Sequence, residues 1–270
     1  MEEDVCLHSK EKRSTVVPAE DGLIHKNVEL KSFGSGEWKV HVIVIPSNVA
    51  MKDFRVAGLP CTSHEGTLGT TQWLASHNNC TIAAMNGSPF GPHAACIGKA
   101  ISNNHALCHD CSNEHIVSLA LTKQNNWVIG HKLTEYSNYQ QLIPGFNEHA
   151  WIIQNGKICV SHDNNAMVVA PRSIVALTDK GTMIWMVVDG CEYCLLGSNG
   201  GMTLKDAAKW LHQHFPNVKH AMNLDGGGSS TLLYKSKVVN HPTAYDVLPI
   251  QSQRPISNIL CLSQNINQMN

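Results

Sequence analysis

The stretch Asn223-Leu224-Asp225-Gly226-Gly227-Gly228-Ser229-Ser230-Thr231 decides how the rest of the chain is interpreted. It includes the end of an apolar run, residues 221–224, which predicts a short buried strand. Three consecutive glycines are costly to order, so they indicate unusual backbone angles or close approach to a ligand. Glycine and serine also offer backbone N–H groups and hydroxyls to an anion such as a phosphate. We expect a phosphate-binding loop with Asp225 as acid, base or metal ligand; a tight turn with a capping aspartate is the alternative.

Five further motifs occur along the chain in a fixed order. They are Met85-Asn86-Gly87 with Phe90, Pro171-Arg172-Ser173, Val187-Val188-Asp189-Gly190, the run from Gly201 to Ala208, and Arg254-Pro255-Ile256-Ser257-Asn258. Together with the glycine-serine stretch, this order resembles the phosphodiester glycosidase family over roughly residues 80 to 262. The chain departs from the family pattern at Ser88 and Pro89, at Ser173 in place of threonine, and at Asp206 in place of glutamate.

The pattern of strands and turns predicts one α+β domain with a mostly antiparallel or mixed sheet and a few flanking helices. Asn155-Gly156 and residues 179–181 each separate two apolar runs, which is typical of β-hairpins and antiparallel pairing. Thr203 with Asp206 predicts a capped helix whose apolar stripe ends before Pro216. Residues 91–109 read as a long functional loop. We expect a polar arm over 1–20, a catalytic domain like that of the family over 21–263, and a polar tail over 264–270.

The composition excludes several classes of protein. The chain has 270 residues, of which 43% are hydrophobic and 15% charged, so it can form a sizeable core and is not a disordered chain. Its formal net charge of -1 predicts no general affinity for nucleic acid or anionic membranes. The acidic start, Met1-Glu2-Glu3-Asp4, is not a signal peptide. We therefore expect a cytoplasmic protein whose ten cysteines are mostly reduced. The sequence does not indicate an oligomeric state.

The resemblance implies cleavage of the bond between a sugar and a phosphodiester, which needs a phosphate-binding group and two carboxyl groups. Asp225 and Asp189 are the expected acid–base pair, and Arg172 is the expected phosphate ligand. The full set of candidate catalytic residues is Asp225, Asp189, Arg172, Asn86 and Asp206, and the candidate binding residues are Gly87, Asn223, Gly226, Gly227, Gly228, Ser229, Ser230, Arg254 and Asn258.

Six of these residues have a structural alternative that the sequence leaves open. Arg172 fits a surface ion pair, and Arg254 fits a clamp on the C-terminal segment. Asp189 fits a turn before a glycine, Asp206 fits a helix cap, and Asn86, like Asn223, fits a hydrogen bond to buried backbone.

The chain contains two C-x-x-C pairs, Cys108 with Cys111 and Cys191 with Cys194, which are candidate metal ligands. Two such pairs can form a structural zinc site of four thiolates if their loops meet. A disulfide or redox role and simple buried cysteines are the alternatives. No cofactor is required by the sequence, and structural zinc is the one candidate.

The reaction expected from the resemblance leaves the substrate open. A small sugar-phosphate diester or a nucleotide-derived diester would fit a hydrolase of this kind. Degradation of a nucleotide signalling molecule, as by a phage or viral protein that counters host defence, is one alternative. A protein that only binds and sequesters a phosphorylated ligand is another, because the strand followed by Asp225 and three glycines could hold a phosphate without catalysis. The chain has no Walker motif and no nucleophile elbow.

Overall fold

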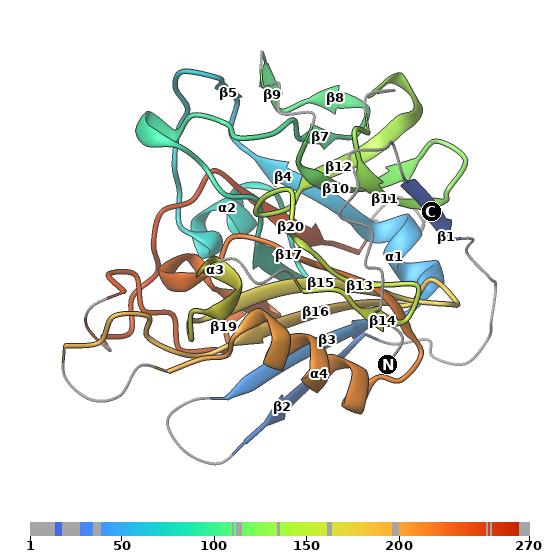
Figure 1. Cartoon of the computed structure of the whole chain (residues 1–270). Helices are drawn as coiled ribbons and strands as arrows, with labels where there is room; N and C mark the ends of the chain where they lie inside the picture. Colours follow the sequence, from blue (N-terminus) through green and yellow to red (C-terminus); the bar gives the residue numbers. More distant parts are fainter. Residues whose placement is uncertain are drawn as a thin grey trace.

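Three antiparallel sheets build the molecule (Figure 1). The computed structural model describes residues 14–17, 28–34, 39–109, 111, 115–133, 136–160, 164–195, 200–246, 248 and 250–264. Among these residues every strand pair is antiparallel except β5 (Cys61–Thr62) with β9 (Cys108–His109). The mostly antiparallel α+β fold expected from the sequence is confirmed.

The seven-stranded sheet is the largest and carries the strands of the Arg172, Val187 and Asn223 motifs. In spatial order it contains β14 (Lys157–Ile158), β13 (Trp151–Gln154), β17 (Val218–Asn223), β15 (Arg172–Thr178), β16 (Met183–Val188), β3 (Val40–Ile45) and β2 (Glu29–Phe33). The expected hairpins β13–β14 and β15–β16 are both present. Asn155 and Gly156 have φ angles of 50° and 79°, as the two central positions of such a turn require.

The two remaining large sheets pack beside this one. The six-stranded sheet contains β1 (Ser14–Val17), β11 (Trp127–His131), β10 (Val117–Thr122), β12 (Tyr139–Pro144), β7 (Ile101–Ser102) and β8 (His105–Ala106). The five-stranded sheet contains β19 (Lys237–Val238), β18 (Leu232–Tyr234), β6 (Ala83–Asn86), β20 (Asn258–Leu262) and β4 (Phe54–Gly58).

The helices are few and short. They are α1 (Ser47–Asp53), α2 (Thr71–His77), α3 (Asn164–Met167) and α4 (Leu204–His214), with 3₁₀ turns η1 (Pro92–Ala94), η2 (Tyr136–Asn138) and η3 (Gly227–Ser229). Thr70 caps α2 by accepting a hydrogen bond from the Trp73 N–H, and Thr203 caps α4 in the same way through the Asp206 N–H. The cap of α4 by Thr203 agrees with the sequence-based prediction.

Alternation along the strands explains how the sheets pack. In β3, Ile43 and Ile45 join the core that all three large sheets share, whereas Val40 and Val42 face the opposite side. That opposite side packs against α4, drawn in orange in Figure 1, through Leu204 and its helical neighbours. Both faces of the seven-stranded sheet are therefore covered, one by the shared core and the other by α4.

Two segments differ from the sequence-based expectation. Residues 91–109 contain η1, β7, β8 and β9 rather than one long loop, because short strands of two residues leave no periodic pattern. Ser14–Val17, inside the expected polar arm, pairs with β11 as strand β1. The rest of that arm and residues 265–270 of the expected tail lie outside the described residues.

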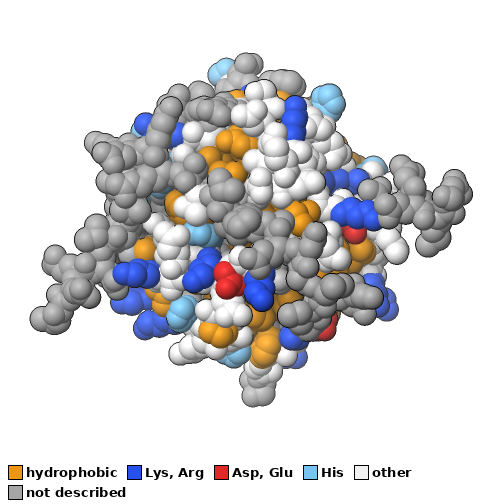
Figure 2. All heavy atoms as spheres, turned by 90° about the vertical axis from the view of Figure 1, so that its right-hand side faces the viewer, with side chains coloured by type: hydrophobic (Ala, Val, Ile, Leu, Met, Phe, Trp, Pro, Cys, Tyr) orange, Lys and Arg blue, Asp and Glu red, His pale blue; other side chains and the backbone are white. Residues whose placement is uncertain are grey.

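The surface seen in Figure 2 carries basic, acidic, histidine and hydrophobic side chains interspersed with one another. The basic groups on that face do not join into one stripe. Within the described ranges, no helix is long and apolar enough to cross a membrane.

Candidate active site

The motif strands β16 and β17 end at one edge of the seven-stranded sheet. Strands β16 and β17 are both antiparallel to β15, so they run in the same direction and finish together. Arg172, at the start of β15, pairs in register with Val188, and Asn223 pairs with Ile174. Asp189 and Asp225, which follow these two strands, therefore lie near this edge, as the sequence predicted.

A pocket of about 200 Å³ opens at this edge. It is rich in charge, and its walls come from segments far apart in the chain. The lining residues are Phe146, Val168, Arg172, Glu192, Asn223, Asp225, Gly226, Gly227, Asp246 and Arg254. Five of them carry charged side chains, and three others belong to the sequence motifs, so this pocket is the candidate active site.

Asp225 is the titratable group in this pocket whose ionisation is clearly perturbed. Burial raises its pKa from the usual 3.8 to about 6, because a carboxylate is poorly solvated in the pocket wall. The Ser229 side chain and the positive charge of Arg254 oppose this shift, while the negative charge of Asp246 adds to it. A carboxyl group with this pKa is available in both protonation states near neutral pH, as a general acid requires.

The glycine-serine loop, Asp225 to Thr231, connects β17 to β18 and so joins two sheets. Gly227 has a φ of +55°, and a Cβ there would lie 2.9 Å from Glu192 Oε2. A Cβ on Gly228 would lie 2.7 Å from Arg254 Nη2 and from two backbone oxygens. These glycines are therefore needed both for the backbone angle and for the close approach of charged side chains.

The backbone N–H groups of this loop point largely into the protein. Those of Gly227 and Ser229 donate to the carbonyls of Pro171 and Gly226, at 3.0 and 3.1 Å. The Gly228 N–H donates to the Asp246 carboxylate. Since these donors are already in use, anion binding in the pocket falls to side chains rather than to the loop backbone.

Two arginines bring positive charge to the pocket. Arg254 forms an ion pair with Asp246, and its Nε donates to the Ala244 carbonyl at 2.9 Å. Arg172 is buried; its Nε donates to the Met202 carbonyl at 3.0 Å and one Nη donates to the Val168 carbonyl. Both guanidinium groups are thus fixed by protein contacts and also line the pocket. The expected phosphate role of each stays a prediction, and the contacts of Arg254 with Ala244 and Asp246 also fit its structural alternative, a clamp on the C-terminal segment.

Asn223 offers an unused polar group to the pocket. Its side chain is 1% exposed and its Oδ1 has no hydrogen-bond partner in the protein. Its backbone, in contrast, is bonded to Ala150 and Phe146. An orphaned buried amide oxygen is unfavourable by itself. A ligand hydroxyl group would satisfy it, which is compatible with the binding role expected for Asn223.

Three other motif residues, Asn86, Gly87 and Asn258, do not line the pocket but form hydrogen bonds that hold the glycine-serine loop and its neighbours. Asn86 is fully buried; its Nδ2 donates to the Asp225 carbonyl at 2.7 Å and its Oδ1 accepts from Ser173 Oγ at 2.7 Å. The Gly87 carbonyl accepts the Asp225 N–H at 3.1 Å. Asn258 holds Ser88 through both ends of its amide. These contacts satisfy buried backbone and position Asp225, which is the structural alternative left open for Asn86.

Asp189 does not line the pocket. It is buried, and its two oxygens accept from His41 Nε2 at 2.9 Å and from the His241 N–H at 2.7 Å. His41 in turn contacts Ser32 Oγ through Nδ1 at 2.9 Å. The proton-transfer role expected for Asp189 stays a prediction without a contact that supports it. Asp206 is exposed at the start of α4, where its carboxylate accepts from Thr203 Oγ1 at 2.7 Å.

Sequence reasoning missed four residues of the pocket: Phe146, Val168, Glu192 and Asp246. Glu192 carried a signal, because it lies inside the Cys191-x-x-Cys194 motif that follows Asp189-Gly190. Asp246 had none, since no pattern marks the loop in which it occurs. The structure shows that Asp246 joins the glycine-serine loop to Arg254, and that Glu192 reaches the pocket beside Gly227.

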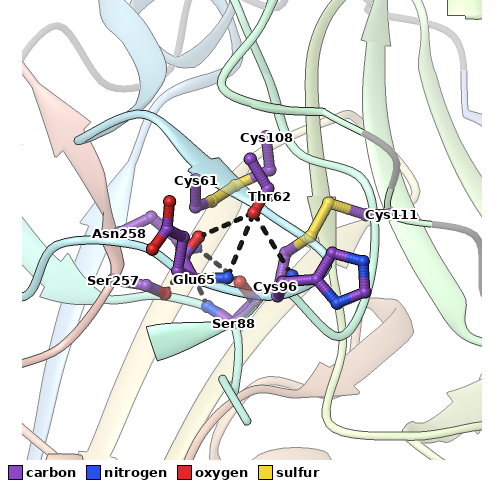
Figure 3. The surroundings of a disulfide bond; sticks show 10 residues. Cys61, Thr62, Glu65, Ser88, Cys96, Cys108, Cys111, Ser257 and Asn258 are labelled. Carbon is purple, nitrogen blue, oxygen red and sulfur yellow. Dashed lines mark hydrogen bonds between the residues drawn. A yellow bond between two sulfur atoms is a disulfide. The ribbon is translucent and has the colours of Figure 1, made fainter. Parts of the chain in front are cut away.

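The cysteines correct the expectation of reduced thiols. The structure pairs Cys61 with Cys108, Cys80 with Cys261, Cys96 with Cys111, and Cys191 with Cys194; Cys159 is also disulfide-bonded. Figure 3 shows the disulfides of Cys108 and Cys111 close together, with Thr62 and Glu65 beside them. The described residues include no free cysteine.

This pairing bears on both the zinc and the location expected from the sequence. A sulfur atom in a disulfide is not a thiolate ligand, so the proposed zinc candidates Cys108, Cys111, Cys191 and Cys194 are not available to a metal in this state. Disulfides are typical of oxidising compartments, whereas the reduced cysteines were expected from a cytoplasmic location. The cytoplasmic location, which was expected from the acidic start of the chain, stays a prediction, and the disulfides do not support it.

Comparison with known proteins agrees with the motifs. The model of the phosphodiester glycosidase family matches residues 79–263. The chain is 22% identical over 216 residues to N-acetylglucosamine-1-phosphodiester alpha-N-acetylglucosaminidase of Bos taurus, covering 72% of this chain and 39% of that protein. The Homo sapiens protein of the same name is 21% identical over 217 residues, covering 72% and 40%. The chain thus spans about two fifths of the length of these relatives.

Solved structures show the same fold. The zebrafish N-acetylglucosamine-1-phosphodiester alpha-N-acetylglucosaminidase catalytic domain, auto-inhibited by its pro-peptide, matches with a TM-score of 0.71 at 20% identity. That match covers 96% of this chain and 90% of the zebrafish domain. A hypothetical protein from Synechocystis matches with a TM-score of 0.61 at 10% identity, covering 87% of this chain and 61% of that one.

Proposed function

We propose that this chain, which belongs to the phosphodiester glycosidase family, hydrolyses the bond between the anomeric carbon of a sugar and an oxygen of a phosphodiester. The observation that carries the proposal is Asp225, a carboxyl group with a pKa raised to about 6 in a pocket that also holds two guanidinium groups. The names of the relatives concern a sugar phosphodiester. They do not favour degradation of a nucleotide signal or simple sequestration.

The two arginines suit the phosphate of such a substrate. A guanidinium group presents a planar set of donors that matches phosphate oxygens. Arg254 and Arg172 are held by carbonyl and carboxylate oxygens, so their side chains are ordered before the substrate arrives. Pre-ordering reduces the entropy lost on binding. The unpaired Oδ1 of Asn223 would accept a hydrogen bond from a sugar hydroxyl group in the same pocket.

Asp225 and Glu192 are the two carboxyl groups that we assign to the chemical step. Protonated Asp225 donates its proton to the phosphate oxygen as the bond to the anomeric carbon breaks. The carboxylate of Glu192 takes a proton from water, whose oxygen bonds to that carbon. The products are a free sugar and a phosphomonoester. Asp246 is engaged by Arg254 and by the Gly228 N–H, so it serves to position the guanidinium group.

The first experiment measures turnover of a panel of sugar-1-phosphodiesters by mass spectrometry, beginning with an N-acetylglucosamine-1-phosphodiester. We expect loss of one diester with release of the matching sugar, absent in Asp225→Asn. The matched control is Asp206→Asn, because Asp206 is an exposed carboxylate outside the pocket. The anomer that is released first, read by NMR, shows whether the configuration is retained or inverted.

Two outcomes would overturn the proposal. Equal turnover by the unaltered protein and by Asp225→Asn would remove Asp225 from the chemical step. A phosphorylated ligand that remains bound and unchanged would instead favour the sequestering protein considered from the sequence.

A further inference from the structure

Exposed hydrophobic side chains occur in the chain segments that line the pocket. Among the described residues, eight large hydrophobic side chains are exposed, and two of these, Leu68 and Trp73, lie elsewhere in the chain. The other six come from three short segments, which we call the rim: Met167 and Val169, Tyr193 and Leu195, and Tyr245 and Ile250. Leu195 is 76% exposed and Tyr245 is 65% exposed, so these side chains do not contribute to the core.

Each rim segment also contributes a wall of the pocket. Val168 lines it between Met167 and Val169, Glu192 lines it just before Tyr193, and Asp246 lines it just after Tyr245. The rim is therefore continuous with the candidate active site.

Hydrogen bonds hold these segments around the pocket. The Tyr193 N–H donates to the Asp246 carbonyl at 2.8 Å, which ties two rim segments together. The third is tied to the pocket by Arg172, which donates to the Val168 carbonyl. Glu192 raises the pKa of the neighbouring Tyr193 hydroxyl, so this rim side chain lies beside a pocket carboxylate.

The rim and the pocket differ sharply in chemistry. The pocket holds three acidic and two basic side chains, whereas the rim holds four aliphatic side chains and two tyrosines. A group of exposed apolar side chains next to a polar cavity typically marks a binding surface. Aliphatic side chains offer no hydrogen bonds to sugar hydroxyl groups, so the rim fits a hydrocarbon better than a second sugar.

We propose that the rim is a subsite for the apolar part of the group linked through the phosphate, so that the substrate is a sugar-1-phosphodiester of a lipid alcohol. The inference rests on the proposed function, since it assigns the polar pocket to the sugar and phosphate. The hydrocarbon chain extends from the phosphate oxygen across Tyr245, Leu195 and Ile250. Each methylene group covered by the rim leaves water, which is the source of the affinity.

The test is a binding series that does not depend on turnover. Asp225→Asn protein is titrated by calorimetry with the methyl, butyl and octyl diesters of one sugar-1-phosphate, each below its micelle concentration. Affinity should rise with chain length by up to about fourfold per buried methylene group. The same series is repeated with Leu195→Ser and Tyr245→Ser added, which should remove most of the dependence on chain length. Leu68→Ser is the matched control and should keep it.

Three results would overturn the subsite. Equal affinity for the methyl and octyl diesters would show that the rim does not bind the chain. An unchanged dependence in the double serine variant would place the chain elsewhere. Self-association of the protein that the same double variant abolishes, without a chain-length effect, would assign the rim to a second copy. Hydrolysis of the methyl diester by the unaltered protein is followed in parallel, because its absence would contradict the proposed function and leave the binding result interpretable.

Discussion

Asp189 and Asp225 occur in the same local sequence pattern, yet their surroundings are opposite. Each follows an apolar strand and precedes a glycine, and the strands β16 and β17 end at the same sheet edge. Asp225 lines a pocket, where burial raises its pKa to about 6. Asp189 lies behind that edge, with both oxygens engaged by His41 and the His241 N–H.

The difference originates in the neighbours rather than in the aspartates themselves. The strand beside β16 is β3, whose His41 is opposite Val187 in register and so reaches Asp189. The chain after Asp225 contains glycines, and the side chains that approach it come from distant loops. A strand followed by Asp-Gly therefore predicts a carboxyl group at a sheet edge, but it does not predict whether that group is satisfied by the protein or left for a ligand.

The largest effect that separates the two aspartates is on turnover. We expect Asp225→Asn to lower kcat by roughly 10³- to 10⁴-fold, because an amide cannot donate the proton. We expect Asp189→Asn, in contrast, to lower kcat by less than about tenfold in protein that remains folded. Both are measured with the best diester of the panel, after thermal unfolding confirms the fold. Equal losses in the two variants would restore Asp189 as the acid–base partner expected from the sequence.

For the free energy of unfolding, we expect substitution of Asp189 to have a large effect, although its effect on kcat is small. Removing one partner of a buried, hydrogen-bonded pair typically costs roughly 3–5 kcal/mol, so we expect Asp189→Ala to lower the free energy of unfolding by this amount. The variant leaves His41 and the His241 N–H without their acceptors. Urea denaturation measures the loss, with exposed Asp206→Ala as the comparison. A loss below about 1 kcal/mol would mean that water replaces the carboxylate at no cost.

The contribution of Asp225 to the free energy of unfolding should decrease as the pH rises, because the pKa of this carboxyl group is raised. Because its pKa is about 6 in the folded chain and 3.8 as a model value, the native state binds more protons between these two values. The stabilising contribution of the protonated group is fully present below about pH 4 and is lost as the pH rises through about 6. At pH 7 the loss is up to about 3 kcal/mol. Asp225→Asn does not titrate, so its advantage over the unaltered protein should grow across this window.

The measurement is urea denaturation of both proteins at several values between pH 4 and pH 8. A difference between them that stays constant with pH would contradict the raised pKa. Turnover supplies a second readout of the same group: kcat should fall with rising pH above about 6, as protonated Asp225 is lost. A kcat that is constant up to pH 8 would remove Asp225 as proton donor.

Many elements of the fold could be predicted from short local sequence patterns. Hairpins such as that at Asn155-Gly156, and the helix that Thr203 caps, depend on a few adjacent residues and were predicted from the sequence. The short strands β7 and β8 were missed, because strands of two residues leave no periodic pattern and β7 pairs with β12, about forty residues along the chain. The same holds for the cysteines, whose partners are up to 181 residues away.

The candidate site was predictable only where its residues belong to a motif. Asp225, Asn223 and Arg254 line the pocket, as expected from the glycine-serine stretch and from the C-terminal motif. Asp246 and Glu192 were missed, because they reach the pocket through loops whose course depends on tertiary contacts. The Gly228 N–H and Arg254 hold Asp246, and these contacts have no counterpart in local spacing.

The smallest effect that we predict concerns the positioning of Glu192. The disulfide between Cys191 and Cys194 encloses Glu192 and restricts the backbone that carries it. We expect Cys191→Ser with Cys194→Ser to lower kcat/KM by about tenfold, since looser positioning of a reacting group costs rate. In a Glu192→Gln background the same pair of substitutions should cost nothing further, because the disulfide acts through that carboxylate. If the tenfold loss persists there, the disulfide acts on the rim instead, through Tyr193, and the second carboxyl group of the reaction must be sought outside this loop.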